Sequence, residues 1–383
     1  GRQINMLGKS LEIRYRNLCG KEDSLPEDGY VGEYVIDIAK EIKEKHGEMF
    51  LEETEKTSNF FRKYAVESIM NLIRKDLEDF RVHFDVWTSQ AEFEERKIVE
   101  RTLEELEKAG YLYEQDGAKW FKSTAFGDDK DRVVRKSDGS YTYLAPDIAY
   151  HKDKYLRKFE KIIDLLGPDH HGYINRMKAA VSAMGYDKSS IDILIVQLAT
   201  LLRNGVAVSM STRRAEFISL REIIDEIGVD VARFIFLMRR LDSHLDFDIE
   251  VAKKESNDNP VYYIQYAHAR ICSIKEFNDK QEERLSLEGA SLSLLSHKTE
   301  KVFIRALSEF PFVVQSAGDA LEPSKIVTYL NDLSRKFHSF YTECRVVSSD
   351  KELSRARLFL VECARIVLSN GLNLLNIALP EKM

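Results

Sequence analysis

The spacing of apolar residues changes along the chain, and this change limits the possible folds more than any other feature. Between residues 111 and 228, short extended runs such as "EKIIDLLG" alternate with helical stretches such as "YINRMKAAVSAMG". From residue 229 to residue 383 the spacing is helical throughout, with breaks at Pro260, Pro311 and Pro323. Strands that alternate with helices predict an α/β unit with a largely parallel sheet, in which "EKIIDLLG" is a fully buried strand. The later helices predict a helical bundle.

The N-terminal part is mainly helical and highly charged. Residues 3–18 have the apolar spacing of an amphipathic helix, and further helical stretches follow between residues 30 and 110. Within this block "VHFDVWTSQ", residues 82–90, has the pattern of a short strand. Because the block contains no phosphate-binding loop, we interpret it as an insertion or a scaffold.

The dipeptide Asn204-Gly205 lies between two apolar extended runs in "ILIVQLATLLRNGVAVS". Both residues tolerate the positive φ of a type I′ turn, so the dipeptide is a strong hairpin signal. The outgoing strand leads into "SMSTRR", residues 209–214, whose hydroxyl groups and fixed positive charges suit a polyphosphate. A solvated turn with two arginines explains the same residues equally well.

The segment "GPDHH", residues 167–171, directly follows the predicted buried strand. Ligands of α/β sheets bind outside the carboxyl ends of the strands, so this segment is placed to meet a ribose or a polar substrate. As an alternative, Asp169 caps a helix. The two adjacent histidines do not predict a metal site, because no third ligand stands at metal spacing.

A third candidate is "YTYLAPDIAY", residues 141–150. If a helix begins near Pro146, Tyr143 and Asp147 lie close together at the end of a strand. A carboxylate and an aromatic hydroxyl are a good pair for a cationic ligand, because a carboxylate binds a guanidinium through two hydrogen bonds. Alternatively, Asp147 only caps the helix and Tyr143 only packs.

A fourth candidate is the helical stretch "NPVYYIQYAHARI", residues 259–271. Aromatic rings together with amide and guanidinium groups suit the stacking and hydrogen bonding of unpaired RNA bases. Core packing accounts for about half of these aromatic residues whatever the function.

Charge and cysteine content exclude several classes of protein. The net charge of −7 argues against a protein that coats nucleic acid indiscriminately. The four cysteines have no CxxC spacing, and no stretch approaches the roughly 20 apolar residues of a membrane span. The acidic run "DSHLDFDIE", residues 242–250, lacks the glycine and the terminal glutamate of a calcium loop, so we interpret it as solvated. We therefore expect a cytoplasmic protein with no tightly bound metal and no membrane contact.

Taken in order, these segments resemble one family. "VSMSTR" resembles the KMSKS loop of class I aminoacyl-tRNA synthetases, and "NPVYYIQYAHARI" resembles the start of the anticodon-binding domain of arginyl-tRNA synthetases. "GRQINMLGKSL", "GPDHHGYINRMKAA" and "LNIALPEKM" are similar to the same family, so the resemblance covers essentially the whole chain. It implies a partial Rossmann-type catalytic domain over residues 1–228, with a mainly helical insertion at about 30–110. It also implies a helical connector over residues 229–258 and a helical anticodon-binding domain over residues 259–383.

The resemblance also implies a reaction, in which the carboxylate of arginine attacks the α-phosphate of MgATP, pyrophosphate leaves, and the arginyl group passes to the terminal ribose of its tRNA. It assigns the catalytic loop to Met210, Ser211 and Arg213. It assigns ATP binding to Gly167, Asp169, Val208, Met210 and Ser211. It assigns the arginine substrate to Tyr143, Asp147 and His170, and tRNA binding to Tyr262, Gln265, Tyr266 and Arg270.

The chain departs from the family pattern at two points. A lysine usually precedes Met-Ser in the loop, whereas Ser209 stands here, so phosphate binding depends on Arg213, Arg214 or a basic group elsewhere. The His-x-Gly-His signature of class I enzymes does not occur in the 383 residues, so we expect that this chain alone does not activate arginine.

Two other interpretations stay open. One is a non-catalytic tRNA-binding protein, in which Tyr143 and Asp147 can be altered without effect. The other is a cysteinyl-type synthetase, although such an enzyme needs a zinc site that the scattered cysteines do not supply. For the arginyl-tRNA synthetase interpretation we expect a monomer.

Overall fold

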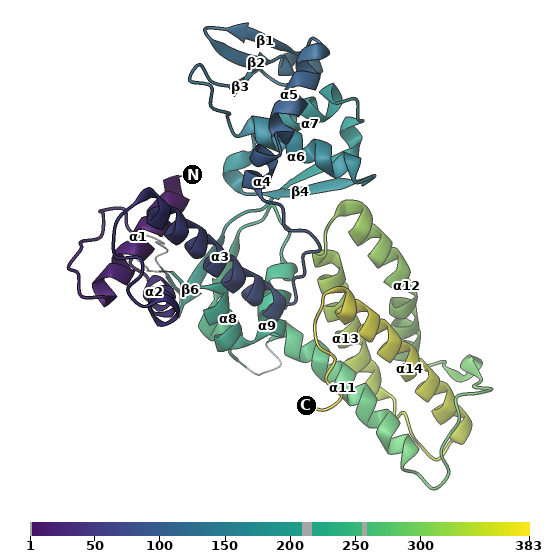
Figure 1. The fold of residues 1–383 in the computed structure, drawn as a ribbon. Coiled ribbons are helices and arrows are strands. Elements are labelled where there is room, and N and C mark those ends of the chain that lie inside the picture. Colours follow the sequence, from purple (N-terminus) through teal and green to yellow (C-terminus); the bar gives the residue numbers. More distant parts are fainter. Residues whose placement is uncertain (1, 209–216, 255–258) are drawn as a thin grey trace. The chain divides into compact units, whose positions relative to one another are not determined.

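The structure is a computed structural model that describes residues 2–208, 217–254 and 259–383 (Figure 1). The chain divides into two compact units, each of which is described by itself. The first unit comprises Gly1–His83, Thr200–Arg239 and Asp246–Met383, and the second comprises Phe84–Ala199 and Arg240–Leu245.

The first unit begins with three helices: α1 (Arg2–Leu18), α2 (Glu33–His46) and α3 (Glu55–Asp79). The apolar face of α1 buries Leu11 and Tyr15 against Ile42 of α2 and Phe61 of α3. The hydroxyl of Tyr15 donates a 2.8 Å hydrogen bond to the Gly47 carbonyl, so the buried phenol is satisfied. The amphipathic helix predicted over residues 3–18 is confirmed.

A small sheet of order β7-β6-β8 and its helices form the middle of the first unit. Their bounds are β6 (Ala199–Arg203), β7 (Val206–Ala207), α8 (Leu220–Ile227), α9 (Val229–Met238), β8 (Leu245–Asp248) and α10 (Ile249–Ala252). Arg203 pairs with Val206 across a two-residue turn in which Asn204 has φ 52° and Gly205 has φ 78°. The predicted Asn-Gly hairpin is therefore confirmed.

Four long helices complete the first unit: α11 (Pro260–Asp279), α12 (Lys298–Ala320), α13 (Ser324–Glu343) and α14 (Lys351–Leu374). A short 3₁₀ turn, Leu292–Leu294, precedes α12. Phe303, Phe337 and Phe340 are fully buried between α12 and α13. The predicted helical bundle is confirmed.

The second unit combines an antiparallel and a parallel sheet. Its elements are α4 (Gln90–Glu95), α5 (Ile98–Lys108), β1 (Leu112–Gln115), β2 (Ala118–Phe121), β3 (Arg132–Arg135), α6 (Leu144–Leu156), β4 (Ile162–Leu166), α7 (Tyr173–Ala183) and β5 (Ile191–Ile195). Short 3₁₀ turns cover Ser123–Phe126, Pro168–His170 and Lys188–Ser190. Strands β1, β2 and β3 are antiparallel neighbours, whereas β4 and β5, which α7 connects, pair in parallel. The predicted α/β unit is confirmed, but its sheets are not largely parallel, because the three-stranded sheet is antiparallel.

Three local predictions are wrong. Strand β4 forms as predicted but is not fully buried, because Ile162 packs toward α6 and α7 while the alternate residues Ile163 and Leu165 are 44% and 63% exposed. No strand forms over residues 82–90, where Phe84, Val86 and Trp87 are exposed. The run 242–250 is not merely solvated, because residues 245–248 form β8, which pairs with β6.

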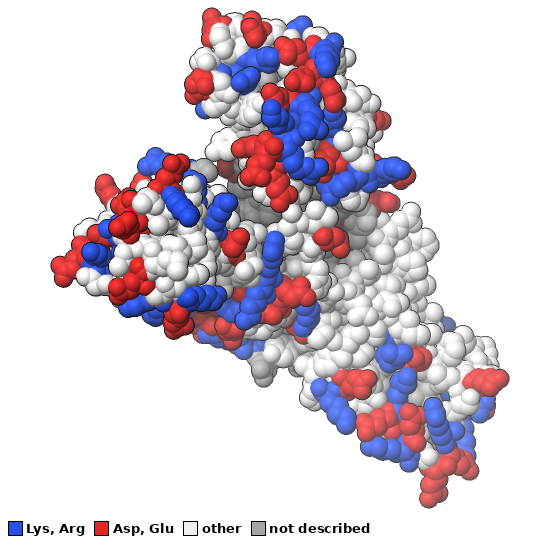
Figure 2. Space-filling model, viewed as in Figure 1, with Lys and Arg blue, Asp and Glu red and all other residues white. Residues whose placement is uncertain are grey.

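Charges of both signs are interspersed over much of the face in Figure 2. The part of this face over α12 is mostly free of charge. The sequence explains this, because residues 310–318 contain no charged side chain, and Phe312 in this segment is 73% exposed. Among the helices that the structure describes, none has both the length and the apolar character that crossing a membrane requires.

Candidate active site and RNA-facing helix

Asp147 lies in the first turn of α6, and the hydroxyl of Tyr173 at the start of α7 donates a hydrogen bond to its carboxylate. Tyr143 is the residue that precedes the helix, and no side chain caps it. The alternative that Asp147 only caps a helix is therefore wrong. Its carboxylate instead joins two helices of the second unit.

Burial raises the pKa of Asp147 above its ordinary value, and the Tyr173 hydrogen bond and the nearby charge of His151 oppose this only in part. Burial, followed by the adjacent Asp147 carboxylate, also raises the pKa of Tyr173. Among the described residues no cationic side chain forms an ion pair with Asp147. The site therefore holds a half-buried carboxylate that a cationic ligand would stabilise.

A buried histidine fixes the turn that carries Asp147. The Nδ1 atom of His151 lies 2.7 Å from the carbonyl oxygen of Asp147, and its Nε2 atom lies 2.6 Å from Oδ2 of Asp164 in β4. Lys154 forms a 2.7 Å ion pair with the other oxygen of Asp164. Burial raises the pKa of Asp164, but the hydrogen bonds and charges of His151 and Lys154 outweigh this and hold it below its ordinary value. Helix α6 is thus tied to the strand whose end carries the next group of residues.

Asp169 and His170 lie in the 3₁₀ turn that follows β4, and Gly167 is the residue that precedes this turn. The side chains of Asp169 and His170 are 82% and 49% exposed, and Oδ2 of Asp169 lies 3.7 Å from Nε2 of His170. The His170 ring packs edge-on against Tyr173, with 5.9 Å between the ring centroids. Two predicted residues, Asp147 and His170, therefore contact Tyr173, and Asp169 lies next to His170.

Tyr143 does not supply the hydroxyl group that contacts Asp147. Its side chain is 86% exposed and lines a cavity of about 860 Å³ together with Lys97, which precedes α5, Lys136 and Pro146. The residues that line this cavity do not include Asp147. The aromatic hydroxyl predicted beside the carboxylate is present, but Tyr173 provides it.

Met210, Ser211 and Arg213 lie outside the described residues, but the hairpin that leads to them is well anchored. The Val208 amide donates a 2.9 Å hydrogen bond to the Leu201 carbonyl. The Gly205 amide donates a 2.7 Å hydrogen bond to Asp248, at the end of β8. The guanidinium of Arg203 binds Glu226 of α8 at 2.8 Å and Glu250 of α10 at 2.6 Å. The strands before the predicted loop are therefore held from both sides.

The four residues of α11 that were predicted to contact tRNA differ in their burial and contacts. Gln265 is 6% exposed, and its amide donates hydrogen bonds to Asp230 at 2.9 Å and to the Ala378 carbonyl at 3.1 Å. Its placement favours a structural role and argues against direct contact with tRNA. Tyr262 is half-buried and lines a cavity of about 530 Å³ beside Gly228.

Tyr266 and Arg270 lie on a more open face of the same helix. The Arg270 guanidinium stacks over the Tyr266 and Tyr341 rings at 5.1 and 5.3 Å and donates a hydrogen bond to the Tyr266 hydroxyl. Beside it is a cavity of about 470 Å³ that Phe277 and Arg345 also line. Phe277 is 54% exposed, so this surface offers an aromatic face and two cations.

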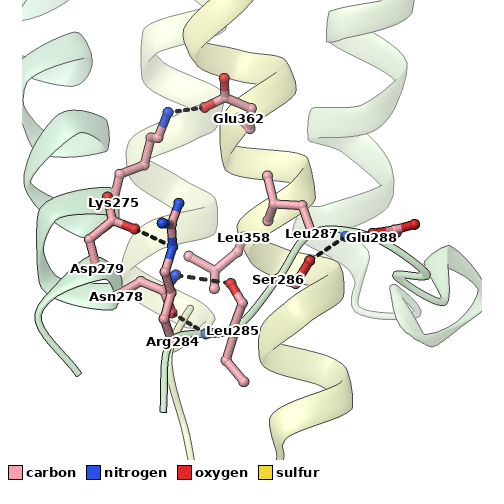
Figure 3. A pocket seen from close by; sticks show the side chains of 10 residues that line it. All are labelled: Lys275, Asn278, Asp279, Arg284, Leu285, Ser286, Leu287, Glu288, Leu358 and Glu362. Carbon is pink, nitrogen blue, oxygen red and sulfur yellow. Dashed lines mark hydrogen bonds and ion pairs between the residues drawn. The ribbon is translucent and has the colours of Figure 1, made fainter. Parts of the chain in front are cut away.

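Another cavity, of about 490 Å³, lies between the end of α11 and α14 (Figure 3). Lys275 pairs with Glu362 at 2.8 Å, and Arg284 pairs with Asp279 at 2.8 Å. The Asn278 side chain holds the backbone of Leu285. Because these charges neutralise each other in pairs, the described residues that line the cavity offer no free cation for a phosphate.

Sequence reasoning missed Tyr173, Asp230 and Asp248 as residues that organise the sites. Tyr173 could have been predicted, because it follows Gly172 at the start of a helix that the apolar spacing indicates. The other two carry no local signal, since their partners are distant in sequence. Within the described ranges no group of three His, Cys, Asp or Glu side chains is arranged to hold a metal ion.

Two family descriptions match this chain. "tRNA synthetases class I (R), catalytic domain" matches residues 2–241, and "DALR anticodon binding domain" matches residues 264–383. Together the two matches cover nearly all of the helices and strands described above.

Curated relatives match over the full length of the chain. Arginine–tRNA ligase 1 of Halalkalibacterium halodurans is 46% identical over 386 residues, covering 100% of this chain and 69% of that protein. Arginine–tRNA ligase of Desulforamulus reducens is 45% identical over 385 residues, with the same coverage of 100% and 69%.

A solved structure agrees with both. A crystal structure from Campylobacter jejuni, described as an arginyl-tRNA synthetase, is 35% identical and superimposes with a TM-score of 0.88, covering 100% of this chain and 83% of the other. The chain therefore belongs to the arginyl-tRNA synthetase family, with a class I catalytic domain followed by a DALR anticodon-binding domain.

Proposed function

We propose that this chain provides the arginine-binding and tRNA-binding parts of an arginine–tRNA ligase, which uses ATP to activate arginine and transfers it to its tRNA. The arginine carboxylate attacks the α-phosphate of MgATP, pyrophosphate leaves, and the 3′-terminal ribose hydroxyl of the tRNA then takes the arginyl group from the adenylate. The observation that carries the proposal is the half-buried Asp147 carboxylate, which has a hydroxyl donor in Tyr173 but no cation in an ion pair among the described residues.

Recognition of arginine follows from this carboxylate. A guanidinium offers two parallel N–H donors, which match the two oxygens of Asp147. Binding supplies the missing positive charge, so it lowers the raised pKa of Asp147 and keeps the carboxylate ionised. Neutral amino acids would leave a buried charge unpaired, which accounts for discrimination against them. His170, on the edge of the Tyr173 ring, borders the same space.

Nucleotide binding involves the turn after β4 and the loop after β7. The exposed Asp169 carboxylate is suited to accept hydrogen bonds from ribose hydroxyls, and Gly167 leaves the backbone open beside it. We assign the triphosphate to Met210, Ser211 and Arg213, with Val208 next to the adenine. A cationic loop would stabilise the charge that develops on the leaving pyrophosphate. Magnesium enters with the nucleotide, as MgATP.

The open face of α11 supports tRNA binding. Arg270, stacked between two tyrosines, together with the exposed Phe277 ring, gives an unpaired base both a stacking partner and a cation. Of the four residues predicted on this helix, Tyr266 and Arg270 are thus the better placed, and Tyr262 remains a prediction. We propose that the protein acts as a monomer in the cytoplasm.

A charging assay tests this function. The natural protein that contains residues 1–383 should transfer radiolabelled arginine to its cognate tRNA only when ATP is present. An Asp147→Asn variant should lose this transfer while still binding tRNA. Charging that survives this substitution would contradict the arginine site, and a protein that binds tRNA but never charges it would support the non-catalytic alternative.

A further inference from the structure

The Asp230 carboxylate in α9 joins three segments that are far apart in sequence. Its Oδ1 atom accepts hydrogen bonds from Arg81, after α3, at 2.6 Å and from the Ala378 amide at 3.0 Å. Its Oδ2 atom accepts a 2.9 Å hydrogen bond from Gln265 of α11. One side chain thus fixes the end of α3, the tRNA-facing helix and the C-terminal segment at a single point.

Arg233, one turn further along α9, holds the same segments through their carbonyl groups. Its guanidinium donates to the Phe80 carbonyl at 2.8 Å and to the Leu375 carbonyl at 3.1 Å, and it stacks on the Phe80 ring at 5.4 Å. Burial lowers the pKa of Arg233, and its hydrogen bonds to carbonyl groups satisfy the buried cation.

The end of α3 and the C-terminal segment meet where two residues have a positive φ, which residues with a side chain rarely adopt. Arg81 has φ 59° and Asn376 has φ 54°, and the Arg81 guanidinium donates a 2.8 Å hydrogen bond to the Asn376 carbonyl. Residues with a side chain adopt this left-handed region only where their surroundings fix it. The junction around Asp230 therefore has one well-defined arrangement.

From this junction, α9 connects to the hairpin before the predicted nucleotide loop. Phe236 of α9 packs against Phe247 of β8, with 5.8 Å between the ring centroids. The next residue in β8, Asp248, accepts the Gly205 amide hydrogen bond at the hairpin turn. A continuous set of packed and hydrogen-bonded groups thus runs from α11 to β6 and β7 within the first unit.

On the other side, Gln265 stands next to Tyr266 and one turn before Arg270. Any change in the tilt of α11 would alter the Gln265–Asp230 hydrogen bond directly. His268 adds to the junction, because its Nδ1 atom lies 2.9 Å from the Pro380 carbonyl. Because Gln265 is buried, its hydrogen bond would respond to the position of α11, and its side chain would not contact the RNA itself.

We propose that Asp230 is a positioning residue, which couples occupation of the tRNA-facing side of α11 to the order of the hairpin at residues 199–208. The inference rests on the proposed function, because it requires tRNA to bind α11. It assigns Gln265 the role of transmitting tRNA binding and gives the C-terminal segment 375–380 a part in this contact. Such coupling is a free energy shared between two sites, so it can be measured without catalysis.

The test uses hydrogen–deuterium exchange of the 199–208 segment, with and without cognate tRNA. The variants are Asp230→Asn and Gln265→Met, which remove the Asp230–Gln265 contact from either side. Asp225→Asn in α8 is the control, because it makes the same chemical change on an exposed side chain of the same unit. Thermal unfolding and the tRNA dissociation constant are measured for each protein.

We expect tRNA to slow exchange in the 199–208 segment of the wild type and the control by at least about fivefold, the low end of coupling between sites. Both junction variants should bind tRNA within about threefold of the wild type but show the same exchange in this segment with and without it. Equal protection in either folded variant would overturn the coupling. If Asp230→Asn fails to fold, Gln265→Met decides the question.

The two proposals fail in different ways. If the wild type binds tRNA but the exchange of residues 199–208 does not respond, the coupling is refuted and the ligase function stands. If the wild type does not bind tRNA, both are refuted.

Discussion

The Tyr173 hydroxyl donates its hydrogen bond to the Asp147 carboxylate across the gap between α7 and α6. These residues are 26 positions apart in sequence. The contact places a half-buried negative charge beside the turn that follows β4, where Asp169 and His170 lie. The arginine site proposed here depends on that charge.

Replacing Asp147 with asparagine should stabilise the fold near neutral pH. Burial raises the pKa of Asp147 in the folded chain, so ionisation of this group opposes folding at every pH above its pKa in the unfolded chain. The asparagine variant should therefore have the larger free energy of unfolding at neutral pH, with a difference that shrinks as the pH falls through the raised pKa. Urea unfolding at about pH 7 and about pH 5 measures this. If the Asp147→Asn variant were less stable than the wild type at pH 7, the prediction would be wrong, because the Asp147 charge would then stabilise the fold.

Removing the Arg132 guanidinium should destabilise the second unit. Arg132 binds the buried Asp128 carboxylate through two nitrogens, at 2.8 and 3.0 Å. Burial opposes ionisation of Asp128, but these hydrogen bonds hold its pKa well below the usual range. An Arg132→Met variant leaves a buried charge without its cation, which costs about 3 kcal/mol of unfolding free energy. Urea unfolding should show almost no change for the control Lys130→Met, because the Lys130 side chain is exposed.

Acid should weaken the base of the hairpin through Glu226. Hydrogen bonds from Arg203, followed by those from Lys253, lower the pKa of Glu226 from 4.5 to about 2. A lowered pKa means that this stabilisation is complete above pH 4.5 and is lost as the pH falls toward 2. The Tm of Glu226→Gln should therefore be lower than that of the wild type at neutral pH, and the gap should close below pH 4.5. Asp225→Asn should show no such convergence.

Two glycines in the helical bundle should respond to alanine in opposite directions. A Cβ at Gly371 of α14 would lie 2.6 Å from Leu330, which is fully buried and cannot move aside. Overpacking of this kind costs about 1–3 kcal/mol, more than the roughly 1 kcal/mol that alanine adds in helix propensity. A Cβ at Gly318 of α12 meets no atom within 4 Å, so Gly318→Ala should be stabilising. Thermal unfolding of both variants checks the pair, and a stabilising Gly371→Ala would contradict the packing.

Local patterns were enough to predict the elements that depend on short-range chemistry. The Asn204-Gly205 turn forms as expected, because it is specified by residues within four positions. Strand β8 could not be predicted, since the run around Asp246 and Asp248 has many charges and becomes a strand only by pairing with β6. The exposed face of β4 was missed because an apolar run does not reveal how many layers cover it.

The same limit applies to the site residues. Asp147, Asp169 and His170 were predicted because their chemistry and their places near the start of a helix or after a strand are visible in the sequence, and their roles in binding remain predictions. Tyr143 and Gln265 were placed in roles that their exposure and contacts do not favour, since side-chain direction depends on tertiary packing. Met210, Ser211 and Arg213 remain predictions.

The most direct test of the central claim is a calorimetric titration of the protein with arginine and with citrulline, in which a neutral ureido group replaces the guanidinium. The wild type should bind arginine and discriminate against citrulline by roughly 100-fold or more, because only the cation compensates the Asp147 charge. Asp147→Asn should lose this preference, whereas Asp153→Asn, on the same helix, should keep it, because the partly exposed Asp153 pairs with Arg157. Equal affinity of the wild type for both ligands, or an unchanged preference in Asp147→Asn, would contradict the account.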